Sequence, residues 1–330
     1  MRYLYITNTK PWINLAIEEY LFRNGGEETV FLLWQNEPTI VVGKNQNTYD
    51  EINNEFVTSK GIHVIRRITG GGAVYHDLGN VNFSIISQSS DSGIDFKIIN
   101  KPVIDALQGW GIPCEMTGRN DLVINGSKFS GIAQYKSKGR VLNHGTLLFD
   151  TNLDILGQAL NVKEDKLQGK GVQSVKKRVT NIKPWLKENM EVKDFISELG
   201  KSISKLSGEK INPISLTQEE LIEIDRLANE KYRSSDWVYG DSPKFTNRFR
   251  KKFASGIIEL YLYKPADKVE EAHIFGDFFG TEDVTVIENA MKGKVWNIDE
   301  VEKALDSIGD LNLYFGNIKK DELISWWFHE

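Results

Sequence analysis

Residues 66–77 read Arg66-Arg67-Ile68-Thr69-Gly70-Gly71-Gly72-Ala73-Val74-Tyr75-His76-Asp77. An apolar, strand-like run precedes this stretch and strand-like sequence resumes at residue 73, so the glycine loop is short and held between strands. Glycine lacks a Cβ, so a ligand can lie against the backbone and several N–H groups can point at one anion. Arginine adds a planar cation that matches phosphate or carboxylate oxygens. The stretch therefore predicts a loop that binds a phosphate-bearing ligand.

The common nucleotide-binding motifs are absent from this sequence. A P-loop requires G-x-x-x-x-G-K-[ST] at the start of a helix, and a dinucleotide fold requires G-x-G-x-x-G between a strand and a helix. Here the three glycines lead into another strand. The ligand must therefore be held by a different arrangement.

Size, charge and cysteine content narrow the class of protein. A chain of 330 residues exceeds a typical single core, which predicts one large domain and a smaller one. The net charge of −5 argues against nucleic-acid binding as the main role. The sequence has neither a membrane-spanning apolar run nor a signal-peptide core at its start, and its single cysteine excludes an internal disulfide. We expect a cytoplasmic protein that binds neither nucleic acid nor a membrane.

Periodicity predicts alternating helices and strands in the first 240 residues. Apolar spacing favours helices near residues 13–21 and 101–109, and helical spacing dominates from residue 153 to 233. Asn125-Gly126 and Lys138-Gly139 mark hairpin turns, and Thr217 with Glu220 forms a capping-box pattern. Strands are expected at residues 30–34, 39–43, 63–68, 81–87 and 145–149.

The character of the sequence changes around residues 239–243, a Gly/Pro/Ser-rich link. A basic cluster at residues 248–252 follows it, and then come the patterns of a compact α+β unit. The strands of this unit are expected at residues 257–263 and 272–276, and its helices at 285–291, 299–307 and 320–328. We place the domain boundary so that residues 1–244 form the first domain and residues 245–330 the second.

A second motif surrounds the Asn125-Gly126 turn, with Gly118-Arg119-Asn120-Asp121 before it and Lys128 after it. A two-residue turn pairs Ile124 with Ser127 and Val123 with Lys128. Asp121 has an odd residue number and Lys128 an even one, so the sequence alone does not say whether their side chains face the same side of the hairpin. Lys128 lies among small residues, so its ammonium can either enter a cleft and bridge two anions or remain a solvated surface charge.

The third motif is His144-Gly145-Thr146-Leu147-Leu148. His144 begins a strand, and we expect Gly145 to leave open space beside it. A lone histidine is usually a structural hydrogen-bonding group. The five histidines lack the spacing of a metal site.

Taken in chain order, the three motifs resemble those of the lipoate–protein ligase A family. Further matches are Pro11-Trp12-x-Asn14-Leu15-Ala16-x-Glu18-Glu19, the segments at residues 171–175 and 178–181, and Asp236-Trp237-x-Tyr239-Gly240-x-Ser242-Pro243. The resemblance spans the whole chain. It implies an α+β fold, with a biotin/lipoate ligase-like mixed β-sheet domain flanked by helices and a small C-terminal α+β domain.

The resemblance also implies a two-step activity. Lipoate and Mg-ATP first give lipoyl-AMP and pyrophosphate, and the acyl group then moves to a lysine of a lipoyl domain. The acceptors implied are the E2 subunits of 2-oxoacid dehydrogenases and the glycine-cleavage H protein, and the cofactors are ATP and Mg²⁺.

The roles of individual residues follow from their match to the family. Lys128 would contact both the lipoate carboxylate and the α-phosphate and would be the catalytic residue. Asp121 would either assist Lys128 or bind Mg²⁺. The residues implied in binding ATP or the adenylate are Arg67, Gly72, Ala73, Val74, Tyr75, Asn80, Asp121 and Lys128. Those implied in binding lipoate are Trp34, Gly70, Gly71, Lys128, His144 and Thr146, although Trp34 could equally be ordinary strand core.

Three other functions remain to be tested. An octanoyl- or lipoyl-transferase of the same fold requires a thiol near the strand of His144, and the single thiol here is Cys114. A biotin ligase would carry a basic Gly-Arg-rich loop in place of residues 69–72. A non-catalytic lipoate-binding carrier would have no need of Lys128.

Overall fold

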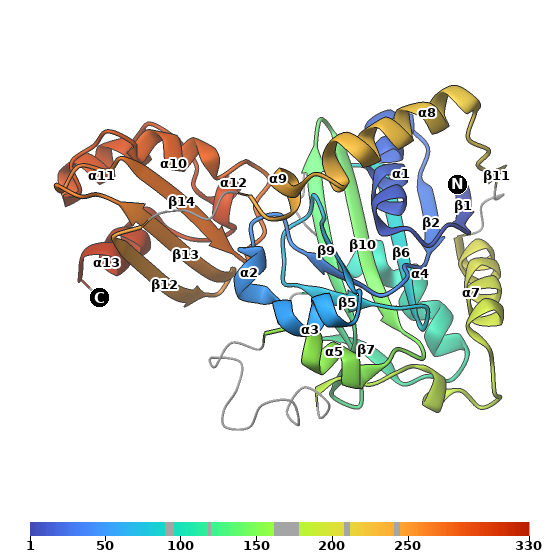
Figure 1. Ribbon diagram of the computed structural model, residues 1–330. Helices are drawn as coiled ribbons and strands as arrows, with labels where there is room; N and C mark the ends of the chain where they lie inside the picture. Colours follow the sequence, from blue (N-terminus) through green and yellow to red (C-terminus); the bar gives the residue numbers. More distant parts are fainter. Residues whose placement is uncertain (90–95, 118–119, 162–177, 208–211, 241–244, 330) are drawn as a thin grey trace. The chain divides into compact units, whose positions relative to one another are not determined.

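The computed structural model describes residues 1–89, 96–117, 120–161, 178–207, 212–240 and 245–329. The chain forms two compact units (Figure 1). The larger unit comprises Met1–Val42, Tyr49–Arg66 and Ala73–Val238, and the smaller comprises Gly43–Thr48, Arg67–Gly72 and Tyr239–Glu330. The glycine loop is therefore grouped with the C-terminal part of the chain. Gly118, Arg119 and the family-like segment at residues 171–175 lie outside the described residues.

The larger unit contains a mixed eight-stranded sheet in the order β11-β1-β2-β6-β10-β9-β8-β7. β1 pairs in parallel with β2 and β11, and the other neighbours are antiparallel. The strands are β1 (Arg2–Ile6), β2 (Val30–Trp34), β6 (Asn80–Gln88), β7 (Cys114–Thr117), β8 (Asp121–Ile124), β9 (Ser127–Ser137), β10 (Arg140–Leu148) and β11 (Asn212–Pro213). The predictions for β2 and β6 are confirmed, whereas β1 and β7 were not predicted and β10 begins earlier than expected.

A second sheet of the larger unit carries the strands on both sides of the glycine loop. β3 (Thr39–Val42) lies between β4 (His63–Arg66), with which it is parallel, and β5 (Val74–His76), with which it is antiparallel. The strands predicted at residues 39–43 and 63–68 are therefore confirmed but end earlier, at Val42 and Arg66.

Helices cover both faces of the eight-stranded sheet. One face packs its apolar side chains, Phe83 among them, against α4 (Phe96–Gly109) and α7 (Val192–Ser207). The other face is contacted by α1 (Pro11–Asn24), whose Glu18 bonds to β6 and β10. The remaining helices of this unit are α2 (Thr48–Glu51), α3 (Asn54–Ser59), α5 (Leu153–Ala159), η2 (Lys183–Trp185), α8 (Gln218–Leu227), η3 (Ala228–Tyr232) and α9 (Ser235–Val238).

The two predicted hairpin turns are confirmed by their backbone angles. Asn125 and Gly126 have φ of 48° and 80°, and Lys138 and Gly139 have φ of 49° and 73°. Two successive positive φ values define a type I′ turn, which follows the twist of the flanking strands. Thr217 forms the predicted capping box with Glu220 at the start of α8.

The smaller unit packs helices on an antiparallel sheet of β12 (Asn247–Phe253), β13 (Gly256–Tyr263) and β14 (Glu271–Gly276). Its helices are α10 (Thr285–Met291), α11 (Ile298–Asp306), α12 (Asn312–Phe315) and α13 (Lys320–His329). The basic cluster at residues 248–252 is strand β12, which we did not predict. Phe249 and Phe253 alternate with its charges and pack against Trp326, with ring centroids 6.4 and 5.3 Å apart.

Among the residues that the structure describes, none of the helices combines the length and the apolar character that a membrane span requires.

Candidate active site

The structure brings Lys128 and Asp121 together. Lys128 Nζ lies 2.7 Å from Asp121 Oδ1, and each side chain is 39% exposed. Lys128 pairs with Val123, as predicted, so the two side chains share a face of the sheet. Asp121 lies two residues before Val123 on β8 and therefore projects from the same face. Asp121 and Lys128 therefore face the same side of the sheet, a point that their residue numbers alone did not decide.

A bulge in β9 makes room for the Lys128 side chain. The register shifts between Leu122 and Val123, so that Asp121 pairs with Gly131. A Cβ added to Gly131 would lie 3.2 Å from Lys128 Nζ. The ammonium thus lies over the one residue type that leaves space for it. Gly131 N also donates to Thr146 Oγ1 at 3.2 Å, which joins this region to β10.

A buried hydrogen-bonded chain continues across the same face. Trp34 Nε1 donates to Ser84 Oγ at 3.0 Å, and Ser84 Oγ donates to Glu18 Oε1 at 2.5 Å. His144 Nδ1 lies 2.9 Å from the same Oε1 atom. All four side chains are buried. Trp34 and His144, two residues predicted to bind lipoate, are therefore linked through Ser84 and Glu18.

The sequence did not single out Glu18 as a site residue. It lies in the apolar spacing of α1 next to Glu19, and both carboxylates are buried. Two adjacent acidic residues inside a buried helical segment are a signal that could have indicated a functional role, because burial of a charge requires a partner.

Gly145 has a different role from the one expected. A Cβ at this position would lie 2.6 Å from the ring of Phe83. Because successive residues of a strand alternate between faces, Gly145 makes room for core packing on the face opposite His144. It does not open space in the site.

Asn80 and Asn82 add amide groups at the other end of this face. Asn80 Nδ2 donates to Asn82 Oδ1 at 2.9 Å, and Asn82 pairs with Trp34 on β2 and Thr146 on β10. Both side chains are buried, and within the described residues Asn80 Oδ1 and Asn82 Nδ2 have no protein partner. A buried amide group without a partner is costly, so these atoms suit a polar ligand.

In the smaller unit, Arg67 shapes the glycine loop. Its Nε donates to Thr69 Oγ1 at 2.9 Å, and its Nη2 donates to the carbonyl oxygens of Gly70 and Gly72 at 2.6 and 2.9 Å. The Arg67 side chain is buried. The guanidinium therefore fixes the course of the loop in this conformation.

The three glycines of the loop have unequal surroundings. A Cβ at Gly70 would lie 2.4 Å from the carbonyl oxygen of Phe278, and Gly71 has a φ of 88° and lies against the ring of Phe279. At Gly72 an added Cβ would meet nothing within 4 Å. Gly70 and Gly71 are thus required by packing, whereas the backbone of Gly72 is open.

Three further predicted residues belong to the larger unit. Val74 and Tyr75 pair with Val41 and Ile40 of β3, and Ala73 precedes them. The Tyr75 side chain is buried, and burial raises its pKa to about 12. Any contact of Tyr75 with a phosphate would therefore involve its main chain, as expected.

The single thiol is unsuited to acyl transfer. Cys114 belongs to the apolar core, and its Sγ lies 3.9 Å from the carbonyl oxygen of Ile104. Burial raises the pKa of Cys114 to about 11. Since the thiolate is the nucleophile, a thiol in this environment is inert at neutral pH.

The described residues contain no group of three or more side chains that could hold a metal ion. Asp121 offers one partly exposed carboxylate. Mg²⁺ is commonly bound by one or two carboxylates together with substrate phosphates, and a single carboxylate fits that mode.

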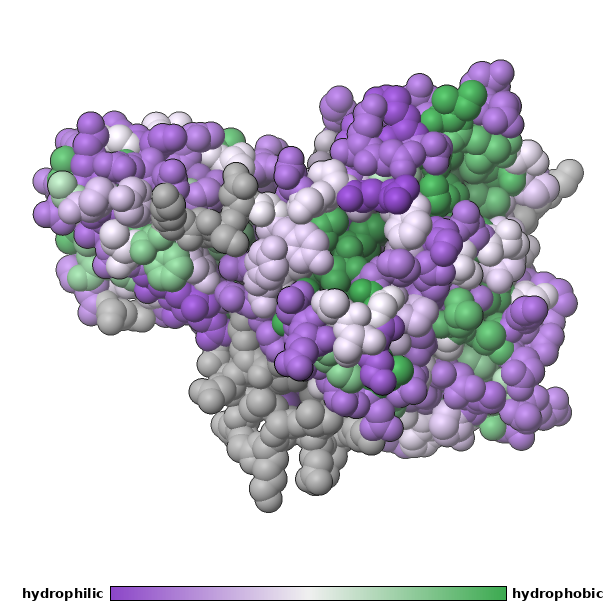
Figure 2. All heavy atoms as spheres, in the orientation of Figure 1, coloured by the Kyte–Doolittle hydropathy of each residue, from purple (hydrophilic) through white to green (hydrophobic). Residues whose placement is uncertain are grey.

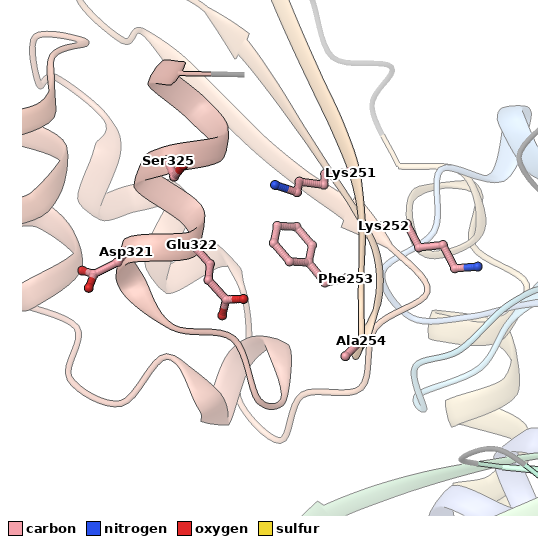
Figure 3. A pocket seen from close by; sticks show the side chains of 7 residues that line it. All are labelled: Lys251, Lys252, Phe253, Ala254, Asp321, Glu322 and Ser325. Atoms are coloured by element: carbon pink, nitrogen blue, oxygen red, sulfur yellow. The ribbon is translucent and has the colours of Figure 1, made fainter.

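A cavity of ≈ 460 Å³ lies in the smaller unit, between β12 and α13. Lys251, Phe253 and Glu322 extend into it, whereas Lys252 and Asp321 point away (Figure 3). A lysine opposed by a carboxylate does not provide the converging donors that a phosphate requires. We therefore place the candidate site on the face of the eight-stranded sheet.

Comparison with known proteins identifies the family. Residues 10–204 match the lipoyl protein ligase A/B catalytic domain, and residues 242–327 match the bacterial lipoate protein ligase C-terminus. The chain therefore belongs to the lipoate–protein ligase family, and the predicted family and enzyme class are confirmed. Lipoate-protein ligase LplJ of Bacillus subtilis (strain 168) is 44% identical over 95% of this chain and 96% of its own length.

Solved structures confirm the predicted fold class. P. falciparum LipL1 in complex with lipoate has a TM-score of 0.80 and 26% identity, over 100% of this chain and 99% of its own. The bipartite ligase of Thermoplasma acidophilum, described with its E2 lipoyl domain, has a TM-score of 0.65 and 27% identity over 74% and 98%. A lipoate-protein ligase A bound with ATP has a TM-score of 0.64 and 26% identity over 72% and 98%.

Proposed function

We propose that this protein is an ATP-dependent lipoate–protein ligase that makes lipoyl-AMP and transfers its acyl group to a lysine of lipoyl domains. Family membership and the relatives bound to lipoate and to ATP support the overall activity. The single observation that carries the mechanism is the position of Lys128, whose ammonium lies beside Asp121 and over Gly131 on the polar sheet face.

Lys128 has the chemistry that the first step requires. The lipoate carboxylate and the α-phosphate are both anionic, so a cation between them lowers their repulsion and stabilises the charge that develops. A carboxylate oxygen then forms a bond to the α-phosphorus as pyrophosphate leaves. In the second step the acceptor lysine amine attacks the acyl carbon, AMP leaves and the amine loses a proton. No enzyme nucleophile takes part, which agrees with the buried Cys114.

We place the acyl chain along the face that carries Thr146, His144 and Trp34. Hydrophobic atoms form the floor of a hollow over β9 and β10 (Figure 2). An apolar slot with a few polar groups suits a ligand that is largely hydrocarbon. The chain formed by Trp34, Ser84, Glu18 and His144 keeps two of these side chains fixed without a ligand.

The nucleotide would be held by Asn80, by the open backbone of Gly72 and by the main chain of Ala73, Val74 and Tyr75, with Arg67 shaping the loop. Mg²⁺, when bound, would neutralise phosphate charge, and Asp121 is the carboxylate suited to it. The ion pair with Lys128 supports the other role of Asp121, which is to orient the ammonium. Residues 1–244 would form the catalytic domain and residues 245–330 an accessory domain, which the C-terminal family match supports.

The acceptors we propose are the lipoyl domains of E2 subunits and the H protein. The archaeal relative described with its E2 lipoyl domain supports the first of these.

The test is to incubate the purified protein with lipoate, ATP and Mg²⁺, without an acceptor. We expect lipoyl-AMP by mass spectrometry and an equal amount of pyrophosphate in a coupled assay. An apo lipoyl domain added afterwards should gain one lipoyl group per acceptor lysine. If neither product forms while an octanoylated carrier still donates its acyl group, the protein is a transferase. If lipoate binds without any turnover, it is a carrier.

A further inference from the structure

The chain leaves the larger unit at three residues that the fold brings together, namely Val42, Arg66 and Val238. Val42 and Arg66 are register partners in the parallel pair β3 and β4. Arg66 Nη2 donates to the carbonyl oxygen of Val238 at 2.8 Å, and Arg66 Nε donates to that of Trp237 at 2.8 Å. The three points at which the chain leaves the larger unit therefore lie together at Arg66.

We call Arg66, Trp237 and Val238 the junction, and its hydrogen bonds run in both directions. Trp237 Nε1 donates to the carbonyl oxygen of Arg66 at 2.8 Å, so each of the two residues binds the main chain of the other. Arg66 is 7% exposed and Val238 4%. Hydrogen bonds from a buried charged group are stronger than those between neutral groups, and they are costly to leave unmade. The three bonds therefore form a rigid connection.

The junction is also anchored on α1. Lys231 Nζ lies 4.2 Å from the centre of the Trp237 ring and 2.8 Å from Glu19 Oε2. Burial alone would raise the pKa of Glu19, but Lys231 and the Tyr232 hydroxyl outweigh it and lower the pKa below its usual value. Glu19 is therefore ionised at neutral pH. Its neighbour Glu18 bonds His144, so the same helix supports the junction and the site.

We propose that Arg66 is a positioning residue for adenylation, which ties the start of the glycine loop to Trp237 and Val238, the last residues before the C-terminal part of the smaller unit. Arg67, one peptide bond after Arg66, opens the loop, and Tyr239, one peptide bond after Val238, begins the C-terminal part of the smaller unit. Through the bonds of the Arg66 guanidinium to residues 237 and 238, we expect nucleotide binding at the loop to stabilise the main chain of residues 235–240. The inference rests on the proposed function, because it assigns ATP to this loop.

Two variants isolate this connection. Arg66→Lys keeps the charge but loses the planar group that reaches two carbonyl oxygens. Trp237→Phe keeps an aromatic ring for Lys231 but removes the return bond. Arg140→Lys is the matched control, because the Arg140 guanidinium also donates to main-chain carbonyls, those of Gly26 and Leu21.

The experiment measures pyrophosphate release against ATP and against lipoate, together with amide hydrogen exchange of residues 235–240 with and without ATP. For Arg66→Lys we expect the KM for ATP to rise about tenfold, the loss of roughly one good hydrogen bond, with the KM for lipoate unchanged. We expect ATP to slow exchange in the wild type and not in this variant. Trp237→Phe should show the same pattern more weakly, and Arg140→Lys should match the wild type.

The inference is overturned if ATP leaves exchange at residues 235–240 unchanged in the wild type. It is also overturned if both junction variants keep the wild-type response, or if the KM values for ATP and lipoate rise together. Thermal unfolding of each variant shows whether it is folded. If Arg66→Lys does not fold, the kinetic and exchange results for Trp237→Phe test the inference instead. If the wild-type protein makes no lipoyl-AMP, the proposed function itself is contradicted. Because hydrogen exchange requires no turnover, it still reports on the role of Arg66 in that case.

Discussion

The two faces of the eight-stranded sheet come from the same strands and bury different chemistry. Along β6 and β10, Phe83 and Leu147 join the apolar core. Ser84, one residue after Phe83, and His144, three residues before Leu147, belong to the buried polar chain. Side chains on a strand alternate between faces, so each strand serves both purposes. One face should therefore govern stability and the other chemistry, and substitutions on either face should have separable effects.

The largest expected effect is on the polar face. Lys128→Ala should lower lipoyl-AMP formation by about 10³-fold, at the upper end of the effect of removing one group that stabilises transition-state charge. The midpoint of thermal unfolding should change little, because the side chain is 39% exposed. Lys136→Ala, on the same strand, is the control and should retain activity. A Lys128→Ala enzyme with more than a tenth of wild-type activity would remove this lysine from the mechanism.

The apolar face should respond in the opposite way. Phe83→Ala empties a fully buried position and should lower the free energy of unfolding by about 3–5 kcal/mol, as measured in denaturant. The folded fraction should still bind lipoate with wild-type affinity, as calorimetry below the unfolding transition would show. Loss of lipoate affinity in the folded fraction would show that the two faces are not separable.

Cys114→Ser also tests the apolar face, because it introduces a hydroxyl there. We expect a loss of about 1–3 kcal/mol in the free energy of unfolding, from a buried polar group without a good partner. The rate of lipoyl-AMP formation should remain within twofold of the wild type. Loss of acyl transfer in a well-folded variant would favour the transferase mechanism.

The smallest substitution adds a single methyl group to the polar face. Gly131→Ala should displace the Lys128 ammonium, which lies 3.2 Å from the new Cβ position. We expect kcat for lipoyl-AMP formation to fall about tenfold, which corresponds to 1.4 kcal/mol of barrier. Gly109→Ala is the matched control, because its Cβ would meet nothing within 4 Å. An unchanged kcat in Gly131→Ala would mean that the ammonium reaches its working position from elsewhere.

Local signals in the sequence were sufficient for much of this fold. Asn125-Gly126 defined a turn and, with it, the pairing of Val123 with Lys128, because a two-residue loop leaves a single register. Strands β2 and β6 were found by their apolar content. The family, the fold class and the ligase activity followed from three motifs, and the comparisons confirm them.

What the sequence missed depends on contacts between distant residues. The sequence predicts only a basic cluster at strand β12 because its aromatic residues alternate with charges. Arg248 and Arg250 bind the buried Glu259 of the neighbouring strand β13, a partner that the basic run does not reveal. The acidic pair Glu18-Glu19 in an apolar helical pattern is a signal of burial, but it does not name the partners of Glu18, which lie 66 and 126 residues away. The open space expected beside Gly145 is wrong, because the ring of Phe83 on another strand lies against this position. The individual roles of the predicted site residues stay predictions.

The bulge in β9 changes which residues of the strand face each side of the sheet. Lys128 and Gly131 are three residues apart yet adjoin on one face, while Phe129 and Ile132 both join the opposite core. From the bulge onward, the odd-numbered positions of β9 take the face that Lys128 began. Deleting one residue between Lys128 and His144 would move every later side chain of the hairpin to the opposite face of the sheet. Polar side chains such as His144 would then be buried in the apolar core. The length of this segment is therefore as tightly constrained as its composition, and an added pair of residues at the Lys138–Gly139 turn is the insertion it can accept.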